Sequence, residues 1–383
     1  MALEKGIAAQ VAEFMAAGRP SSRRQNIDDR RAGYIASTIL AGEKELRVTS
    51  EDIVLEGMTF RVISPLNATH SLPCIIYYHG GCFISGGFAT HDNQLRQLAF
   101  YSGCRVIAVQ YRLAPEHVFP AAHDDAERGA NLIHQYAQRL GVMADKITLA
   151  GDSAGGHLAL ITALRLKAVG QWSPAQLLLI YPMLDATARC ASYVSNGEDY
   201  IITRDTLLSG YELYLSDTDT QHPEASPLWR DDFSGLPLVH IITAEYDPLR
   251  DEGEALYQRL TEQGVSCTCQ RYLGVIHGFF QLGGYKPGSS GCDARRSLAK
   301  RQARCLITPG RVESCFTPPR FHPLRRRQKV WQATQYKCLR ISRPVSRRQT
   351  AQLASERALY GLLPDDPDRR LTTPDRQWPW ACR

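Results

Sequence analysis

The sequence predicts an α/β protein built on a doubly wound, mostly parallel β-sheet. From about residue 46 to 284, short β-rich runs alternate with helical stretches. Four of the predicted strands, at 74–78, 105–111, 177–181 and 238–244, are apolar at nearly every position rather than at every second one. Strands have this composition when helices cover both faces of a parallel sheet. Such a sheet places its functional site at the carboxyl ends of its strands.

The predicted elements follow in chain order. Residues 1–45 are expected to form amphipathic helices, with Gly42 as their stop. Strands are expected where β-branched and aromatic residues concentrate, at 47–55, 59–64, 74–78, 105–111, 146–150, 177–181, 238–244 and 267–272. Helices are expected where apolar residues recur at helical spacing, at 93–101, 121–140, 154–168 and 248–263. Because residues 185–229 are too long for an ordinary connection and include a helical stretch, we expect them to join residues 1–45 in a helical cap.

Charge divides the chain into two parts. The 383 residues carry 45 Lys and Arg against 39 Asp and Glu, a net charge of +6. Residues 1–284 hold 23 basic and 32 acidic side chains, whereas residues 285–383 hold 22 and 7. The expected domains are therefore cap helices at 1–45, an α/β domain at 46–284 with an insertion at 185–229, and a basic extension at 285–383. Nucleic acid is not an expected partner, because the attraction for polyanions lies in the extension alone.

The basic extension, residues 285–383, is expected to be poorly ordered, since it holds ten of the 21 prolines and no strand-helix alternation. Only 293–307 could form a helix there. Two explanations remain open: a change of reading frame near residues 284–286, which the nucleotide sequence would reveal, and a genuine basic arm that attracts acidic surfaces.

Compartment signals favour a cytoplasmic protein without a membrane segment. No apolar run approaches the roughly 18 residues of a membrane span, and Glu4 and Glu13 interrupt what would be the apolar region of a signal peptide. The eleven cysteines lack paired spacing, which favours reduced thiols.

The sequence GDSAG at 151–155 joins a predicted strand to a predicted helix. Its small residues permit a tight turn that projects a serine hydroxyl from the sheet edge, and the helix N-terminus favours a developing anion nearby. Ser153 is therefore the candidate nucleophile; the alternative is a purely structural turn.

A serine nucleophile needs a base that a third group orients. In sheets of this kind the three follow the order serine, acid, histidine. Of the eleven histidines, only His277 and His322 follow the acid candidates, and His322 falls within the basic extension. His277 comes just after the last predicted strand and is the candidate base. His157 would lie along the helix that follows Ser153, and we expect a structural or pocket-lining role for it.

The strand at 238–244 runs into three acidic residues. Asp247 stands at its carboxyl end, where Pro248 fixes the next turn, and is the candidate acid. Asp251 lies in the first turn of the following helix, where a carboxylate is favoured, and is expected to support the site. Glu245 is expected to be solvated or to face the cap.

The strand at 74–78 runs into HGGCF at 79–83. Its glycines allow backbone N–H groups to face a cavity without side chains in the way. The N–H groups of Gly80, Gly81 and Cys82, with that of Ala154, are the candidate oxyanion donors. His79 and Asp152 are expected to support them.

These residues belong to five motifs that occur in order: HGGCF at 79–83, YRLAPEH with FPAA and DD between 111 and 125, GDSAGGHLA at 151–159, DPLRD at 247–251 and HGF at 277–279. In them the sequence resembles the hormone-sensitive-lipase-like carboxylesterases of the α/β-hydrolase superfamily, close to bacterial acetyl esterases. The resemblance covers about residues 40–284. It implies an α/β-hydrolase fold with a cap, a Ser153–Asp247–His277 triad, oxyanion donors at Gly81, Cys82 and Ala154, neither metal nor other cofactor, and short-chain acyl esters as substrates.

The sequence departs from the family pattern in two places. Cys82 stands where the family has the third glycine of a His-Gly-Gly-Gly motif, and activity is expected to survive unless that position requires a positive φ. The basic extension replaces the final helix that follows HGF in the family.

Amide or lactone hydrolysis and a non-catalytic small-molecule receptor remain alternative functions. The expected partner is a small-molecule ester, and homodimerisation remains open.

Overall fold

The computed structural model describes residues 2–18, 20–66, 68 and 70–283. Eight strands form one sheet in the order β1-β2-β4-β3-β5-β6-β7-β8. Their bounds are β1 Val48–Leu55, β2 Met58–Pro65, β3 Leu72–Tyr78, β4 Arg105–Val109, β5 Val142–Asp152, β6 Gln176–Ile180, β7 Leu238–Tyr246 and β8 Cys267–Ile276. β2 pairs antiparallel with β1 and β4, and every other pair is parallel. The predicted α/β fold with a mostly parallel sheet is confirmed.

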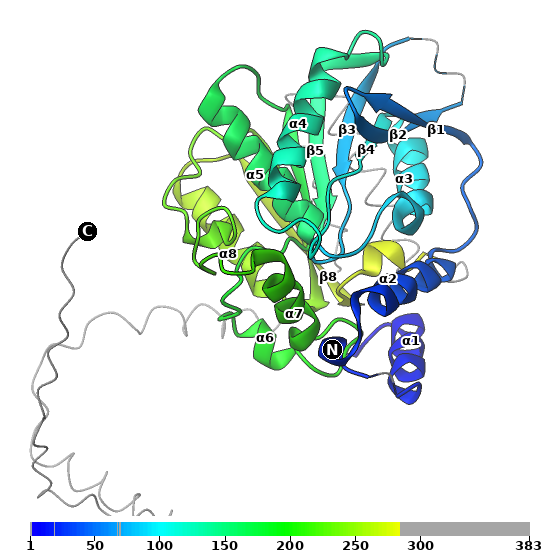
Figure 1. Cartoon of the computed structure of the whole chain (residues 1–383), viewed down its shortest axis with the longest axis vertical. Coiled ribbons are helices and arrows are strands. Elements are labelled where there is room, and N and C mark those ends of the chain that lie inside the picture. Colours follow the sequence, from blue (N-terminus) through cyan, green and yellow to red (C-terminus); the bar gives the residue numbers. More distant parts are fainter. Residues whose placement is uncertain (1, 19, 67, 69, 284–383) are drawn as a thin grey trace, which may run out of the picture. The chain divides into compact units, whose positions relative to one another are not determined.

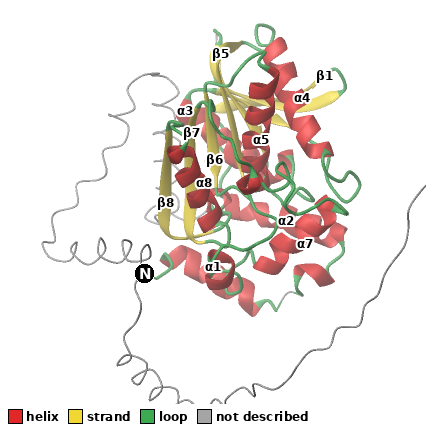
Figure 2. Cartoon of the chain, turned by 90° about the vertical axis from the view of Figure 1, so that its left-hand side faces the viewer, coloured by secondary structure: helices red, strands yellow, loops and turns green. Residues whose placement is uncertain are grey.

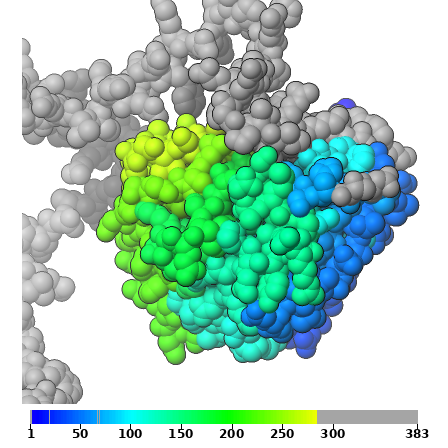
Figure 3. All heavy atoms as spheres, turned by 90° about the horizontal axis from the view of Figure 1, so that it is seen from above, coloured from blue at the N-terminus to red at the C-terminus, as the bar shows by residue number. Residues whose placement is uncertain are grey.

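The core forms two hydrophobic clusters, one on each face of the sheet. Alternate residues of β3 divide between them, because Ile76 joins one cluster and Ile75 the other. The helices α4 (Ala121–Gln135), α5 (Ala154–Val169) and α8 (Arg250–Glu262) cover the first face, and α3 (Phe88–Ser102) covers the second (Figure 1). Seen from above, the colours pass from blue to yellow across the molecule, as a strand order with β1 and β8 at opposite edges requires (Figure 3).

Four further helices gather at one end of the sheet: α1 (Lys5–Ala16), α2 (Ile27–Ala36), α6 (Ser192–Ser195) and α7 (Arg204–Leu215). The first two come from the N-terminal segment and the others from the connection between β6 and β7. Figure 2 shows α1, α2 and α7 close together below the strands. Arg23 links the two segments by ion pairs to Asp205 and Glu212. This is the end at which the loops after β3, β5, β7 and β8 leave the sheet.

Several predicted boundaries differ from the observed ones for local reasons. The helix predicted to reach residue 140 ends at Gln135, because a series of turns closes at Gly141, whose φ is +61°. β5 then begins at Val142 rather than at 146. α3 begins five residues earlier than predicted, because the Thr90 hydroxyl accepts from the Gly87 N–H at 3.0 Å and starts the helix there.

The helical segments of the described part of the chain include none long and apolar enough to cross a membrane. The six described cysteines are all free thiols. The predictions for the basic extension, including the helix at 293–307, lie outside the described residues.

Candidate active site

Ser153 lies in the sharp turn between β5 and α5. Its backbone adopts φ +55° and ψ −119°, a conformation that costs a residue with a side chain about 1–3 kcal/mol. The turn is held on both sides, because the Ser153 N–H donates to the Ile180 carbonyl at 2.9 Å and the Met183 N–H donates to the Ser153 carbonyl at 3.2 Å. No side chain is tolerated on the glycine two residues later: a Cβ on Gly155 would lie 1.9 Å from the Tyr78 carbonyl oxygen. The local sequence thus fixes where the hydroxyl points.

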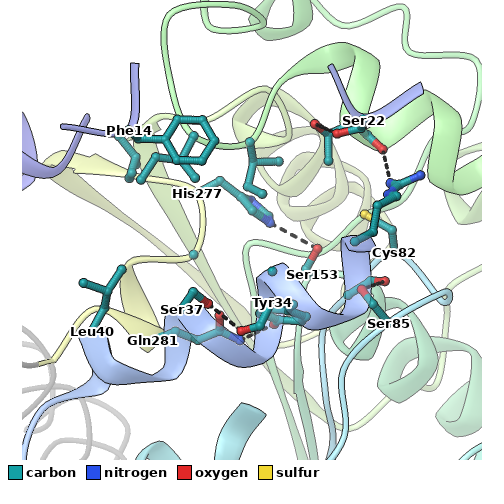
Figure 4. A pocket seen from close by; sticks show the side chains of 18 of the residues that line it. Phe14, Ser22, Tyr34, Ser37, Leu40, Cys82, Ser85, Ser153, His277 and Gln281 are labelled. Carbon is teal, nitrogen blue, oxygen red and sulfur yellow. Dashed lines mark hydrogen bonds between the residues drawn. The ribbon is translucent and has the colours of Figure 1, made fainter. Parts of the chain in front are cut away.

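A hydrogen-bonded chain runs from Ser153 through His277 to Asp247. His277 Nε2 lies 3.1 Å from Ser153 Oγ, and its Nδ1 lies 2.8 Å from Asp247 Oδ2 (Figure 4). The other carboxylate oxygen, Asp247 Oδ1, accepts the Leu249 N–H at 2.7 Å. The exposed fractions are 4% for Ser153, 8% for His277 and zero for Asp247, so the carboxylate is removed from water and the other two groups nearly so. This arrangement can draw a proton from the serine hydroxyl and stabilise the resulting imidazolium.

The loop after β3 bends sharply beside Ser153. Gly81, Cys82 and Phe83 all have positive φ, of +130°, +55° and +63°. The bend is closed by the Gly81 carbonyl, which accepts the N–H groups of Ile84 and Ser85 at 3.1 and 3.0 Å. Among the described residues, the N–H groups of Gly81 and Cys82 meet no acceptor, nor does that of Ala154. These three N–H groups are therefore available to a developing oxyanion.

Gly80 differs from the sequence prediction. Its N–H donates to Asp152 Oδ1 at 2.9 Å and is not available to a substrate. Tyr77 also donates its hydroxyl to Asp152 Oδ1, at 2.8 Å, and His91 Nε2 lies 3.1 Å from the same oxygen. Burial alone would raise the pKa of Asp152, but these partners outweigh burial and the pKa lies below its ordinary value. Asp152 thus acts as an ionised anchor for the start of the loop.

His79 lies beneath the loop rather than in the cavity. Its ring stacks on Tyr111 with 4.2 Å between centroids, and the Tyr111 hydroxyl donates to the His79 carbonyl at 2.7 Å. Burial lowers the pKa of His79 to about 3, so its imidazole is neutral. It supports the loop by packing and carries no charge toward a substrate.

Cys82 stands where the family has a glycine, and the expected effect of this difference depended on the backbone φ at position 82. Its φ of +55° places a side chain in the left-handed region, so the penalty on a non-glycine residue applies here. Its side chain is buried against α7, where Gly210 leaves room for it: a Cβ at position 210 would lie 2.6 Å from Cys82 Cβ. The segment between β6 and β7 therefore packs directly on the loop after β3.

A cavity of about 250 Å³ opens onto Ser153. Its walls combine the loop after β3, the residues around His277, and both segments expected to form the cap. Figure 4 shows Phe14 and Leu40 toward one side of this cavity and Ser22 and Cys82 toward the other, with Ser153 and His277 between them. The cavity is also lined by Tyr34, by Gln281 and by two residues of the connection between β6 and β7, Ile202 and Thr206.

The remaining predicted residues lie away from the reacting atoms. Asp251 accepts the Ser192 N–H at 2.8 Å and so ties α6 to the start of α8. Glu245, expected to be solvated or to face the cap, is partly buried and accepts the Gly274 N–H of β8 at 2.7 Å. His157 is buried, with Nε2 2.9 Å from His123 Nε2, and has a structural environment rather than a place in the cavity. His322 lies outside the described residues.

Sequence reasoning missed His91, Arg30 and Gly210. His91 and Gly210 carry no local signal, because their importance arises from contacts with residues far along the chain. Arg30 belongs to the run of charged residues that precedes Gly33, and that run marks only an exposed helix surface when it is considered alone. Within the described part of the chain, no group of three or more His, Cys, Asp or Glu side chains is arranged to hold a metal ion.

Comparison with known proteins identifies the family of the chain. The α/β-hydrolase-fold family matches residues 75–281. The chain is 34% identical over 266 residues to the carboxylesterase NlhH of Mycobacterium tuberculosis, covering 68% of this chain and 83% of the relative. It is 32% identical over 298 residues to an ethyl acetate hydrolase of Pseudomonas putida, covering 74% and 93%.

Solved structures give the same result. An α/β-hydrolase enzyme from the metagenome of Lake Arreo superposes with a TM-score of 0.74 at 35% identity, covering 80% of this chain and 99% of the other. A hyperthermophilic esterase of the archaeon Pyrobaculum calidifontis superposes with a TM-score of 0.71 at 35% identity, covering 80% and 98%. The chain therefore belongs to the hormone-sensitive-lipase-like carboxylesterases of the α/β-hydrolase fold, and it is a carboxylic ester hydrolase.

Proposed function

We propose that the protein hydrolyses short-chain acyl esters through a Ser153–His277–Asp247 triad and an acyl-enzyme intermediate. The observation that carries this proposal is the hydrogen-bonded chain from Ser153 Oγ to His277 to Asp247, at 3.1 and 2.8 Å. The length of the acyl group is supported by the cavity of about 250 Å³ and by the relative named ethyl acetate hydrolase.

In the acylation step, His277 Nε2 takes the proton of the Ser153 hydroxyl while Oγ forms a bond to the ester carbonyl carbon. The negative charge on the carbonyl oxygen is held by the N–H groups of Gly81, Cys82 and Ala154. As the tetrahedral intermediate collapses, the bond to the alkoxy group breaks and His277 returns its proton to the departing alcohol. Asp247 keeps His277 in the tautomer that presents a lone pair to Ser153.

In the deacylation step, a water molecule replaces the alcohol. His277 takes one proton from this water while its oxygen attacks the acyl carbon, and the proton then passes to Ser153 Oγ as the bond to the acyl group breaks. The products are the carboxylic acid and the free enzyme.

The test is Ser153→Ala with 4-nitrophenyl acetate. We expect kcat/KM to fall at least about a thousandfold, with an unchanged thermal unfolding transition. Ser102→Ala is the matched control, because Ser102 is equally buried but lies at the far end of α3. In the wild type, a fluorophosphonate probe should attach to Ser153, as located by peptide mass spectrometry. Substantial hydrolysis by Ser153→Ala would overturn the proposal.

Substrate class is tested by two series. Esters of 4-nitrophenol with acyl chains from acetyl to dodecanoyl should show kcat/KM falling beyond the short chains, because the cavity is small. Parallel assays with 4-nitroacetanilide and a γ-lactone distinguish ester hydrolysis from amide and lactone hydrolysis, since the triad alone does not select the leaving group. A protein that bound esters without turnover would instead be a receptor.

A further inference from the structure

The cavity beside Ser153 has two chemically different ends. Phe14 and Leu40 lie toward one side of Ser153 in Figure 4, and Ser22 lies toward the other. Ser22 Oγ is 2.8 Å from Thr206 Oγ1, and Arg30 Nη2 donates to the Thr206 carbonyl at 3.4 Å. These contacts place Arg30 at the Ser22 end. Phe14 and Leu40 thus contribute apolar surface on one side, near Ser37, and the other side contains hydroxyl groups and a guanidinium group.

Arg30 differs from Arg23 and Arg31 in the same segment, which both form ion pairs. Arg23 forms ion pairs with Asp205 and Glu212, and Arg31 forms one with Glu116 at 2.7 Å. Arg30 has no carboxylate within 4 Å among the residues that the structure describes, and its bond to Thr206 is long. The acidic side chains of this region therefore form ion pairs with Arg23 and Arg31. Arg30 lines the cavity without an ion-pair partner among the described residues.

The surroundings of Arg30 make this unmatched charge costly. Arg30 is half-buried, and burial lowers the pKa of its guanidinium group, with smaller opposing influences from Cys82 and then Asp205. Cys82, which also lines the cavity, is a neutral thiol at this site, since burial raises its pKa to about 11. A carboxylate entering this end would meet a planar guanidinium group that matches it in shape and charge, with one Nη2 hydrogen already directed to the Thr206 carbonyl.

We propose that Arg30 binds a carboxylate carried by the substrate, so that the preferred substrates are esters bearing a second, ionised acid group. Half-esters of dicarboxylic acids and acyl esters of hydroxybenzoic acids are the two forms of this chemistry. The proposal rests on the proposed function, because it assigns substrate specificity to the same cavity. Arg30 would act in substrate binding, with no part in proton transfer.

The experiment compares each anionic ester with a neutral ester of the same shape. The first pair is monoethyl succinate and ethyl 4-methylpentanoate, in which the charge lies on the acyl side. The second pair is 4-acetoxybenzoate and 4-isopropylphenyl acetate, in which the charge lies on the alcohol side. Hydrolysis is followed by titration at constant pH for the wild type, Arg30→Gln and Arg24→Gln. Arg24 is the matched control, because it is exposed and does not line the cavity.

In at least one pair, Arg30→Gln should lower the ratio of kcat/KM for the anionic ester to that for the neutral ester about tenfold or more. Arg24→Gln should leave both ratios unchanged. The pair that responds identifies the side of the ester that faces Arg30. Equal effects of Arg30→Gln on both members of both pairs would overturn the proposal and leave Arg30 with a structural role at Thr206.

A second measurement does not depend on the folding of an Arg30 variant. In Ser153→Ala, which does not consume substrate, phenylglyoxal adducts at Arg30 and Arg24 are quantified by peptide mass spectrometry. Monoethyl succinate or 4-acetoxybenzoate should protect Arg30 and not Arg24, whereas the neutral esters should protect neither selectively. Equal protection by charged and neutral esters would overturn the proposal. If the wild type hydrolysed none of the four esters, the proposed function itself would fail; hydrolysis with unchanged ratios would remove only the role of Arg30.

Discussion

Gly210 of α7 lies directly against Cys82 in the oxyanion loop, 128 residues earlier in the chain. A Cβ placed on Gly210 would be 2.6 Å from Cys82 Cβ and 3.4 Å from the Cys82 carbonyl oxygen. The first of these distances is too short for two non-bonded carbon atoms, and neither Cys82 atom belongs to the flexible end of a side chain. The N–H of Cys82 is one of the donors proposed for the oxyanion. A substitution at Gly210 should therefore alter the catalytic rate.

Gly210→Ala is expected to lower both stability and activity. The added methyl group must push α7 away from the loop or displace Cys82, at a cost of about 1–3 kcal/mol in the free energy of unfolding. Displacement of Cys82 would weaken a hydrogen bond made in the transition state, so kcat should fall more than KM changes. Denaturant unfolding and steady-state kinetics with a short-chain ester measure both effects.

The double variant Gly210→Ala/Cys82→Gly distinguishes this contact from a general effect on α7. Removing the Cys82 side chain makes room for the new methyl group and also relieves a side chain at φ +55°. Activity should therefore recover in the double variant relative to Gly210→Ala alone. If the effect of the double variant equalled the sum of the effects of Gly210→Ala and Cys82→Gly, the contact between these residues would not be the cause.

Asp247→Asn is expected to lower kcat by about three to four orders of magnitude while the fold is retained. The Asp247 carboxylate accepts two N–H groups, one from His277 Nδ1 and one from Leu249. An amide has only one acceptor oxygen, so its NH₂ group would meet either the imidazole or the Leu249 N–H. An NH₂ group facing the imidazole favours the wrong tautomer, with the proton on Nε2. An NH₂ group facing Leu249 keeps the tautomer but sets two N–H groups against each other, and either orientation removes the negative charge that stabilises the imidazolium.

Asp251→Asn is the matched comparison for Asp247→Asn. Asp251 accepts the Ser192 N–H and pairs with Arg250, both away from His277. Its replacement should cost about 1–2 kcal/mol in the free energy of unfolding and leave kcat within a few fold of the wild type. A similar loss of kcat in both variants would contradict the separate roles argued for these carboxylates.

The parts of the site that could be predicted from the sequence are those fixed locally. Ser153, Asp247 and His277 each follow a strand directly, so the end of the strand and the next turn determine their place at the sheet edge. The alternation of strands and helices likewise predicted the sheet. The role of the Gly80 N–H was misjudged, because its partner Asp152 is the last residue of a neighbouring strand, 72 residues later. The contacts of Arg30 and Gly210 depend on how two helical segments approach the sheet, and no local pattern encodes that approach.

Stability is expected to fall as the pH drops below about 6.5, owing in part to a buried histidine pair. His123 Nε2 and His157 Nε2 lie 2.9 Å apart, and His123 Nδ1 is 2.7 Å from the Tyr214 hydroxyl of α7. Burial lowers the pKa of both imidazoles, that of His157 to about 4. The nearby His157 ring lowers the pKa of His123 further. Both are neutral in the fold, whereas the unfolded chain takes up protons near pH 6.5. The stabilisation is complete above that pH and is lost as the pH falls toward 4.

At pH 5 the contribution of His157 to this loss is about 2 kcal/mol. The free energy of unfolding, measured with urea between pH 8 and 5, should therefore decline less steeply in His157→Asn than in the wild type. His70→Asn removes an exposed histidine and serves as the control, with the wild-type slope expected. Equal slopes in all three proteins would contradict the assignment of neutral imidazoles to this pair.

The buried carboxyl group of Glu252 should produce the opposite dependence on pH. Glu252 is fully buried at the start of α8 and accepts the N–H groups of Leu184 and Asp185 in the loop after β6. Burial raises its pKa well above the ordinary value, because the charged form loses its hydration, and the two N–H groups offset this only in part. The folded protein therefore holds a proton that the unfolded chain releases above about pH 4.5. This contribution to stability is present at low pH and is lost as the pH rises.

Glu252→Gln keeps an oxygen acceptor for the two N–H groups and removes the ionisation. The variant should thus become more stable relative to the wild type as the pH rises from 4.5 to 9, and the difference between their unfolding temperatures should grow over that range. Glu254→Gln is the control on the same helix, since Glu254 is partly exposed and paired with Arg271. The difference in unfolding temperature between Glu254→Gln and the wild type should not grow in this way, because the variant lacks the ion pair with Arg271 across the range. A constant difference for Glu252→Gln across the whole range would mean that the carboxyl group is already ionised in the folded protein.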